Sequence, residues 1–181
     1  MSTRYIVGFS RQKHIFAKAI MWFTRSNVSH VYIRQESEAG RYVLESRAKG
    51  VRLEWCGDPG TVVQEFEVDH VGLDRAWAQV CSVRLNRAYG WSTIVGDAYV
   101  YAILWLTGKW VTNPFPAPYQ DVCSELVLAW ILHAGIPGFD GLDRVSIAPA
   151  DGRSGNPGLL EVVRDQPQVF RAIQQDTFER S

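Results

Sequence analysis

Residues 29–55 read SHVYIRQESEAGRYVLESRAKGVRLEW, and this stretch decides the fold. It holds three short runs rich in β-branched and aromatic residues, at 30–35, 42–46 and 51–55, which polar turns separate. Such runs predict β-strands, and connections this short join antiparallel neighbours. A fourth run of the same kind follows at 62–68. The block therefore predicts an antiparallel β-meander.

Helical patterns flank this block. Ahead of it we expect a strand at 5–9 and a helix over 12–23. After it we expect helices over 73–89, 92–106 and 121–133, then a strand at 159–163 and a weak helix after Gln166. In the helical segments apolar residues recur three and four positions apart. Gly135, just after the helix predicted over 121–133, is expected to end that helix. A run of strands followed by helices predicts an α+β fold, an antiparallel sheet with helices grouped on it.

Composition limits the class of protein. A chain of 181 residues suits one domain, for which we expect a core over about 4–151 and a C-terminal extension over 152–181. Nineteen basic residues balance nineteen acidic ones, which argues against a nucleic-acid partner. The three cysteines include no CxxC pair, so neither a disulfide framework nor a structural zinc site is predicted. We expect no metal and no cofactor.

No secretory or membrane-spanning segment is predicted. Residues 11–14 are charged or polar where the apolar run of a signal peptide would continue. The most apolar stretch, AYVYAILWL at 98–106, is shorter than the roughly 20 residues that a spanning helix needs. We therefore expect a soluble, cytoplasmic protein in which residues 99–106 form a buried core helix. The less favoured role for residues 99–106 is to form the wall of an apolar pocket or to contact a membrane peripherally.

Cys123 is the first candidate for chemistry. It follows a proline-rich loop and falls in the first turn of the helix predicted over 121–133. There, free backbone N–H groups and the helix dipole favour a thiolate over a thiol. Val127, Trp130 and Ala134 share its helical face, which aims the thiol inward. The alternative is a small buried cysteine without a chemical role.

A nucleophilic cysteine needs a base, and the base needs a group that orients it. Of the four histidines, His30 opens the first strand of the meander. If 30–35 and 41–47 form a hairpin with its turn at Ser37-Glu38, then Glu45 lies directly opposite His30. A register shift of two residues would leave the two diagonal neighbours, whereas a shift of one would separate them. A solvated Glu45 and a satisfied surface His30 fit this argument equally well.

Four segments, in this order, resemble one group of proteins. They are Ser29-His30-Val31, LESRAKGV at 44–51, Tyr89-Gly90 and CSELV at 123–127, joined by the helix before the histidine and by Pro149-Ala150-Asp151. The chain resembles the circularly permuted NlpC/P60 group of papain-like proteins, in particular its YiiX-like branch, which is related to lecithin:retinol acyltransferase-type enzymes. In that group the histidine strand precedes the cysteine helix. The resemblance covers residues 6–149 and implies a circularly permuted papain-like fold.

The resemblance also implies a role for each matching residue. Cys123 would be the nucleophile, His30 the general base and acid, and Glu45 the polar third member. Backbone N–H groups near the start of the cysteine helix would bind the oxyanion. The candidate substrate-binding residues are Tyr89, Tyr32 and Ser124.

The expected function is that of a cysteine hydrolase of the amidase or peptidase type, working through an acyl-enzyme on Cys123. The NlpC/P60 side of the resemblance implies a peptide or peptidoglycan amide as substrate. The acyltransferase side implies an acyl lipid, so a lipid-directed acyltransferase or thioesterase is the alternative enzyme. A non-catalytic binding or assembly module that keeps the fold is the alternative of another class. A metal enzyme with His30, Glu45 and Cys123 as ligands explains these residues less well than the cysteine hydrolase does. Small stand-alone proteins of this group suit a phage or mobile-element origin.

Overall fold

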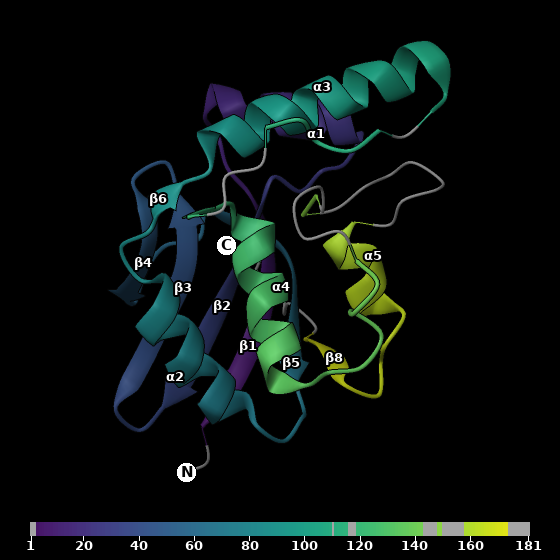
Figure 1. Ribbon diagram of the computed structural model, residues 1–181. Coiled ribbons are helices and arrows are strands. Elements are labelled where there is room, and N and C mark those ends of the chain that lie inside the picture. The colour runs from purple at the N-terminus through teal and green to yellow at the C-terminus, as the bar shows by residue number, and fades with distance from the viewer. Residues whose placement is uncertain (1–2, 110, 116–118, 143–147, 150–157, 174–181) are drawn as a thin grey trace, which may run out of the picture.

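The computed structural model of the protein describes residues 3–109, 111–115, 119–142, 148–149 and 158–173. Its centre is a six-stranded antiparallel sheet in the order β4-β3-β2-β1-β5-β8 (Figure 1). The strands of this sheet are β1 (Arg4–Arg11), β2 (His30–Ser37), β3 (Gly40–Arg47), β4 (Gly50–Trp55), β5 (Thr61–Val68) and β8 (Phe170–Ile173). Two short parallel strands, β6 (Ala88–Tyr89) and β7 (Gln120–Asp121), form a separate pair. The α+β class with an antiparallel sheet is as expected.

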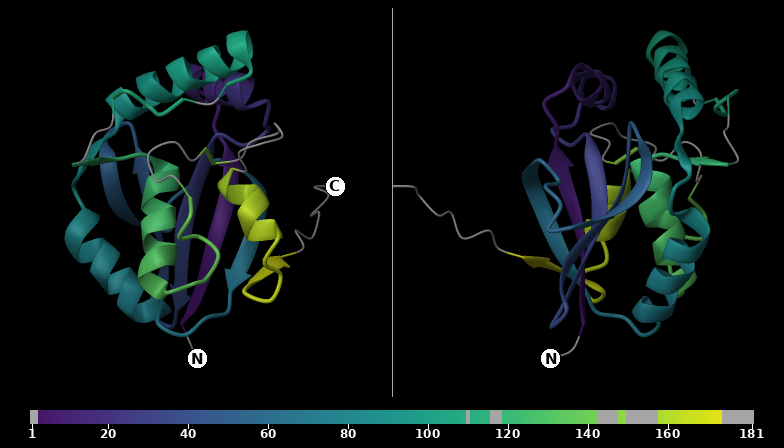
Figure 2. Two further views of the ribbon diagram at one scale, coloured as in Figure 1. Left: turned by 45° about the vertical axis from the view of Figure 1, so that its right-hand side comes forward. Right: turned by 90° about the vertical axis from the view of Figure 1, so that its left-hand side faces the viewer.

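The helices form two groups. One face of the sheet is covered by α4 (Cys123–Ala134), with α2 (Leu73–Arg84) beside it, and α5 (Leu159–Arg164) lies toward β8 (Figure 1). The other two, α1 (Ile15–Thr24) and α3 (Trp91–Thr107), lie together beyond one end of the sheet (Figure 2). That is the end where β1 stops and β2 starts, because α1 is the connection between those two strands.

The meander prediction is right for three strands and wrong for the fourth. β2, β3 and β4 follow one another as antiparallel neighbours. β5 does not continue from β4, because it crosses to the far side and pairs with β1. β1 is buried from Tyr5 to Ser10 and has strand neighbours on both edges, which satisfies its backbone N–H and C=O groups.

The C-terminal region corrects two predicted elements and one boundary. The expected strand at 159–163 is the helix α5, and the expected helix after Gln166 is the edge strand β8. Short apolar runs do not distinguish a buried strand from a buried helix turn, and pairing with β5 decided the second case. Leu159, Leu160 and Phe170 are core residues, so this region is part of the core and not an extension beyond it.

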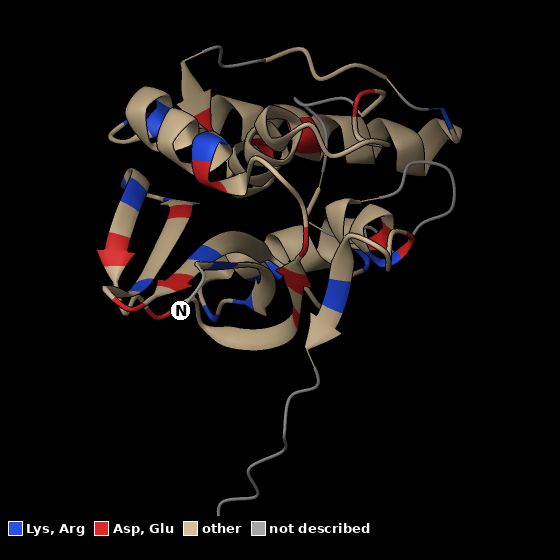
Figure 3. Ribbon diagram, turned by 90° about the horizontal axis from the view of Figure 1, so that it is seen from below, with Lys and Arg blue, Asp and Glu red and all other residues tan. Residues whose placement is uncertain are grey.

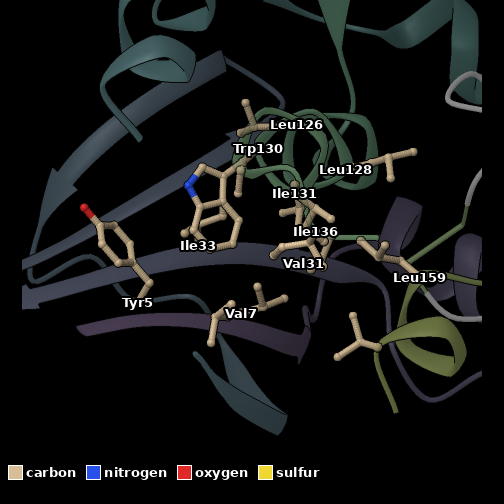
Figure 4. Packing of buried hydrophobic residues seen from close by; sticks show 14 of the residues in the cluster. Tyr5, Val7, Val31, Ile33, Leu126, Leu128, Trp130, Ile131, Ile136 and Leu159 are labelled. Carbon is tan, nitrogen blue, oxygen red and sulfur yellow. The ribbon is translucent and has the colours of Figure 1, made fainter. Parts of the chain in front are cut away.

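The core lies between α4 and the sheet (Figure 4). Trp130, Leu126 and Ile131 of α4 are fully buried and face Val31 and Ile33 of the strand β2 (Figure 4). Burial of each such side chain stabilises the fold by about 1.5–3 kcal/mol. The prediction that the cysteine helix buries an apolar face is therefore confirmed.

Helix α3 departs from its prediction. Val100 and Tyr101 are buried, but Tyr99, Trp105 and Leu106 are 48%, 44% and 82% exposed. The expectation of a buried core helix over 99–106 is thus wrong, because α3 lies beyond the end of the sheet beside α1 and, among the described residues, no sheet face covers its outer side (Figure 2). None of the helices among the described residues combines the length and the apolar character needed to cross a membrane.

Candidate active site

The hairpin of β2 and β3 brings His30 close to Glu45. The paired residues run from Ile33–Leu44 to Ser37–Gly40, so the register is shifted by two residues from the predicted one. A shift of two keeps His30 and Glu45 on one face as diagonal neighbours. Glu45 Oε2 lies 2.9 Å from His30 Nε2, and both side chains are buried. The predicted contact is present although the predicted register is wrong.

Cys123 is the first residue of α4. The short strand β7 leads into the helix, and Glu125 Oε2 accepts a hydrogen bond of 3.0 Å from the N–H of Val122, which caps the helix start. Cys123 is 4% exposed and lies beside the His30 imidazole, close enough to raise the pKa of that ring. Three side chains from β2, β3 and α4 therefore meet at the end of the sheet where α1 and α3 lie.

The ionisation of His30 reflects these two partners. Burial disfavours the charged imidazolium, but the hydrogen bond with Cys123 and then the one with Glu45 outweigh it and raise the pKa of His30 to about 9. The positive ring is thus stabilised by Cys123 on one side and by Glu45 on the other. A thiolate–imidazolium pair is the state of a cysteine that is ready to attack.

Two arginines that the sequence analysis missed hold Glu45. Arg47 Nε forms an ion pair of 2.7 Å with Glu45 Oε1, and Arg52 Nη2 lies 3.7 Å from the same oxygen. Arg52 is the direct partner of Glu45 in the β3–β4 ladder. Strand alternation could have identified Arg47, because residues two apart in a strand, such as Glu45 and Arg47, share a face. The two arginines turn one carboxylate oxygen away from His30 and leave the other for its ring.

A second cluster fixes the start of α4. Ser46 Oγ donates a hydrogen bond of 2.5 Å to the backbone oxygen of Asp121, the residue just before Val122. The Asp121 carboxylate pairs with Arg84 and lies 3.7 Å from Arg87. Burial raises the pKa of Asp121, while Arg84 and then Arg87 oppose that rise. These contacts tie β7, and with it Cys123, to the strand that carries Glu45.

The predicted substrate-binding residues separate into two groups. Tyr89 and Ser124 line the same pocket as Cys123. Burial, and then the charge of Cys123, raise the pKa of Tyr89, so its hydroxyl keeps its proton and can donate. Tyr32 does not line this pocket.

Tyr32 is fully buried beside the site. Its ring stacks on that of His30 at 6.4 Å between centroids, and its hydroxyl donates to Glu65. Opposite it stands Gly8, where a Cβ would lie 2.1 Å from the Tyr32 ring. Only glycine leaves room for the ring, so Tyr32 supports the position of His30 from behind.

The pocket beside Cys123 is apolar. It encloses about 210 Å³ between the inner sides of α1 and α3 and the start of α4. Ile20, Phe23, Ile94 and Ala98 contribute to its walls. Asp97, the one carboxylate among the described lining residues, accepts a hydrogen bond of 2.8 Å from Asn113. Cys123 therefore lies in the wall of a small apolar cavity.

Compared with models of known protein families and with curated proteins, the chain matches none. In the described part of the chain, no three of the His, Cys, Asp and Glu side chains are arranged to hold a metal ion. The sequence segment Pro149-Ala150-Asp151 lies partly outside the described residues, and Pro149 itself lines the pocket beside Cys123.

Proposed function

We propose that the protein is a cysteine-dependent hydrolase or acyltransferase that forms an acyl-enzyme on Cys123. The observation that carries the proposal is the position of His30, which lies beside Cys123 and contacts the buried Glu45 at 2.9 Å. A nucleophile, a base and a group that orients the base are the three parts such catalysis needs. The order of the histidine strand and the cysteine helix supports a relation to the circularly permuted NlpC/P60 group.

The proton transfers in the reaction depend on which ring nitrogen of His30 is not engaged by Glu45. Glu45 engages Nε2 of His30, so Nδ1 takes the thiol proton of Cys123. The Cys123 sulfur attacks the acyl carbonyl, and the oxyanion is met by backbone N–H groups at the start of α4. His30 then gives the proton to the leaving amine, alcohol or thiol as its bond to the acyl carbon breaks. Water, deprotonated by His30, attacks the thioester and releases a carboxylic acid and the free thiol, or a second acceptor takes the acyl group.

The pocket favours one substrate class among those expected. Its apolar walls suit an acyl chain, which gains about 0.8 kcal/mol for each buried methylene. A peptide or peptidoglycan amide brings backbone groups that need hydrogen-bond partners, and the pocket offers few. An acyl-lipid ester, amide or thioester is therefore the first substrate class to test, and the peptide amide is the second.

Alkylation of Cys123 by iodoacetamide, followed by mass spectrometry, tests the nucleophile and its base. We expect Cys123 to react below the usual thiol range of about pH 8.5, and His30→Ala to remove that advantage. Cys56, which is exposed, and Cys81, whose pKa is raised to about 11 by burial, are internal controls in the same chain. Reaction no faster than at Cys56, or no effect of His30→Ala, would leave the non-catalytic binding module as the better account.

A further inference from the structure

Helices α1 and α3 expose an unusual amount of apolar surface. Of the fourteen large hydrophobic side chains that are exposed in the described part of the chain, eight lie on these two helices. We call them the α1–α3 surface, and they are Ile15, Phe16, Trp22, Trp91, Val95, Tyr99, Trp105 and Leu106. Exposed apolar side chains gathered on two neighbouring helices favour an interaction site there. Trp22 and Trp105 join the two helices across this surface, with 4.6 Å between ring centroids.

Both sides of these helices are apolar, for different reasons. The inner sides line the pocket next to Cys123, whereas Trp22 on α1 and Leu106 on α3 face solvent and are 58% and 82% exposed. The two helices stand apart from the rest of the molecule at the end of the sheet (Figure 2). Phe16 and Val95 are exposed and also line the pocket, so these two residues connect the α1–α3 surface to the pocket beside Cys123.

Basic residues predominate among the charges around this surface. Residues 11–25 carry Arg11, Lys13, Lys18 and Arg25 and no acidic residue. Asp97 is the one acidic residue of α3, and it lines the pocket. Elsewhere the two signs are interspersed over strands and helices (Figure 3). Because a symmetric pair of copies would bring this basic segment against itself, an anionic partner fits better than a second copy.

A polar cavity of about 390 Å³ lies at the start of α1. Arg11, Lys13 and Arg47 line it together with Gln12 and Asp58. Gln12 Nε2 is buried without an acceptor, and neither Arg11 nor Lys13 forms an ion pair within the described residues. Donors without acceptors in a basic cavity suit an anionic phosphate-type headgroup.

We propose that the α1–α3 surface docks the protein onto the surface of a lipid bilayer that contains anionic lipids. Tryptophan, tyrosine and leucine side chains would enter the boundary between headgroups and acyl chains, and the flanking basic residues would contact the headgroups. Helix α3 has 17 residues and lies on the surface in this arrangement, with its inner side still facing the pocket. The inference does not require turnover at Cys123.

Co-sedimentation of the full chain with vesicles tests the docking. We expect binding to vesicles of phosphatidylcholine mixed with phosphatidylserine, weaker binding to phosphatidylcholine alone, and loss of the difference at high salt. Lys13→Glu with Lys18→Glu should weaken binding to the anionic vesicles by about tenfold or more. Cys123→Ala should bind like the wild type, which separates this result from the outcome for catalysis.

Matched variants test which surface binds. Leu106→Ser and Trp22→Gln should each reduce binding severalfold. Val71→Ser and Trp55→Gln should not, although these side chains are equally exposed at 84% and 58%. Circular dichroism identifies any variant that fails to fold. The proposal is overturned if the wild type stays in the supernatant, if the controls lose as much binding, or if light scattering shows a dimer that Leu106→Ser dissociates.

Discussion

Glu45 reaches Nε2 of His30 at 2.9 Å across a diagonal of the β2–β3 hairpin, not across a directly opposed pair. Arg47, two residues along the same strand, contacts the other oxygen of this carboxylate at 2.7 Å. Arg52 approaches that oxygen from β4. A group held on three sides has little freedom to leave the histidine, and this fixes the ring that faces Cys123.

Replacement of Glu45 by Gln should remove the negative charge that stabilises the His30 imidazolium. Glu45→Gln keeps the shape and an acceptor but removes the negative charge, so the pKa of His30 should fall from about 9. We expect alkylation of Cys123 at about pH 7 to slow by roughly 10–100-fold, the range that loss of a hydrogen-bond partner typically costs at a metal-bound histidine. Alkylation of Cys56 in the same sample is the control. An unchanged pH profile of Cys123 would show that Glu45 does not act on His30.

His30 should make the stability of the protein depend on pH. Its folded pKa of about 9 lies above the ordinary value of 6.5, so the folded protein binds more protons between these values. The stabilisation is complete below about pH 6.5 and is lost as the pH rises through about 9. It amounts to at most about 3 kcal/mol. Urea unfolding at several pH values measures it, and His30→Gln should flatten the profile in this window.

Urea unfolding of Cys123→Ala at several pH values shows how much of the pH-dependent stabilisation by His30 comes from Cys123 and how much from Glu45. The hydrogen bond with Cys123 is the larger of the two causes that raise the pKa of His30. We therefore expect Cys123→Ala to flatten the profile more than Glu45→Gln does. The reverse order would contradict the close contact between Cys123 and His30.

Glu125 should contribute a second pH dependence at lower pH. Burial raises its pKa to about 8, against the backbone hydrogen bond from Val122. A raised carboxyl pKa lets the folded state hold a proton that the unfolded state releases, so stability falls as the pH rises from about 4.5 to about 8. Glu125→Gln keeps an acceptor for Val122 and should be more stable than the wild type at about pH 8, by about 1 kcal/mol or more. A loss of stability would mean that the ionised carboxylate is the better cap.

Filling the apolar pocket should select against long acyl chains. Ala98 lines the pocket, whereas Ala102, one turn further along α3, is not among its lining residues. We expect Ala98→Phe to lower the hydrolysis of dodecanoyl aryl esters or thioesters by about tenfold or more while sparing acetyl ones, since each excluded methylene forfeits about 0.8 kcal/mol. Ala102→Phe is the matched control. Equal losses for both chain lengths would argue that acyl chains bind elsewhere.

Most of the local elements followed from the sequence, apart from those expected at 159–163 and after Gln166. Alternation in residues 30–55 predicted the hairpin strands, and a period of two guaranteed that a register shift of two left His30 and Glu45 neighbours. The proline-rich loop before Cys123 and Gly135 after its helix placed the cysteine in the first turn of α4, where Gly135 ends the helix with a φ of 75°. These features depend on residues close together in the chain, so local pattern is enough to predict them.

Tertiary packing decided the rest. The crossing of β5 to β1, the contact of Cys123 with His30 and the pocket between α1 and α3 all join segments far apart in the sequence. The same holds for the exposure of α3, because an apolar helix has the same pattern whether a sheet or solvent covers it. Periodicity states which side of an element is apolar, and only the positions of the other elements determine what that side meets.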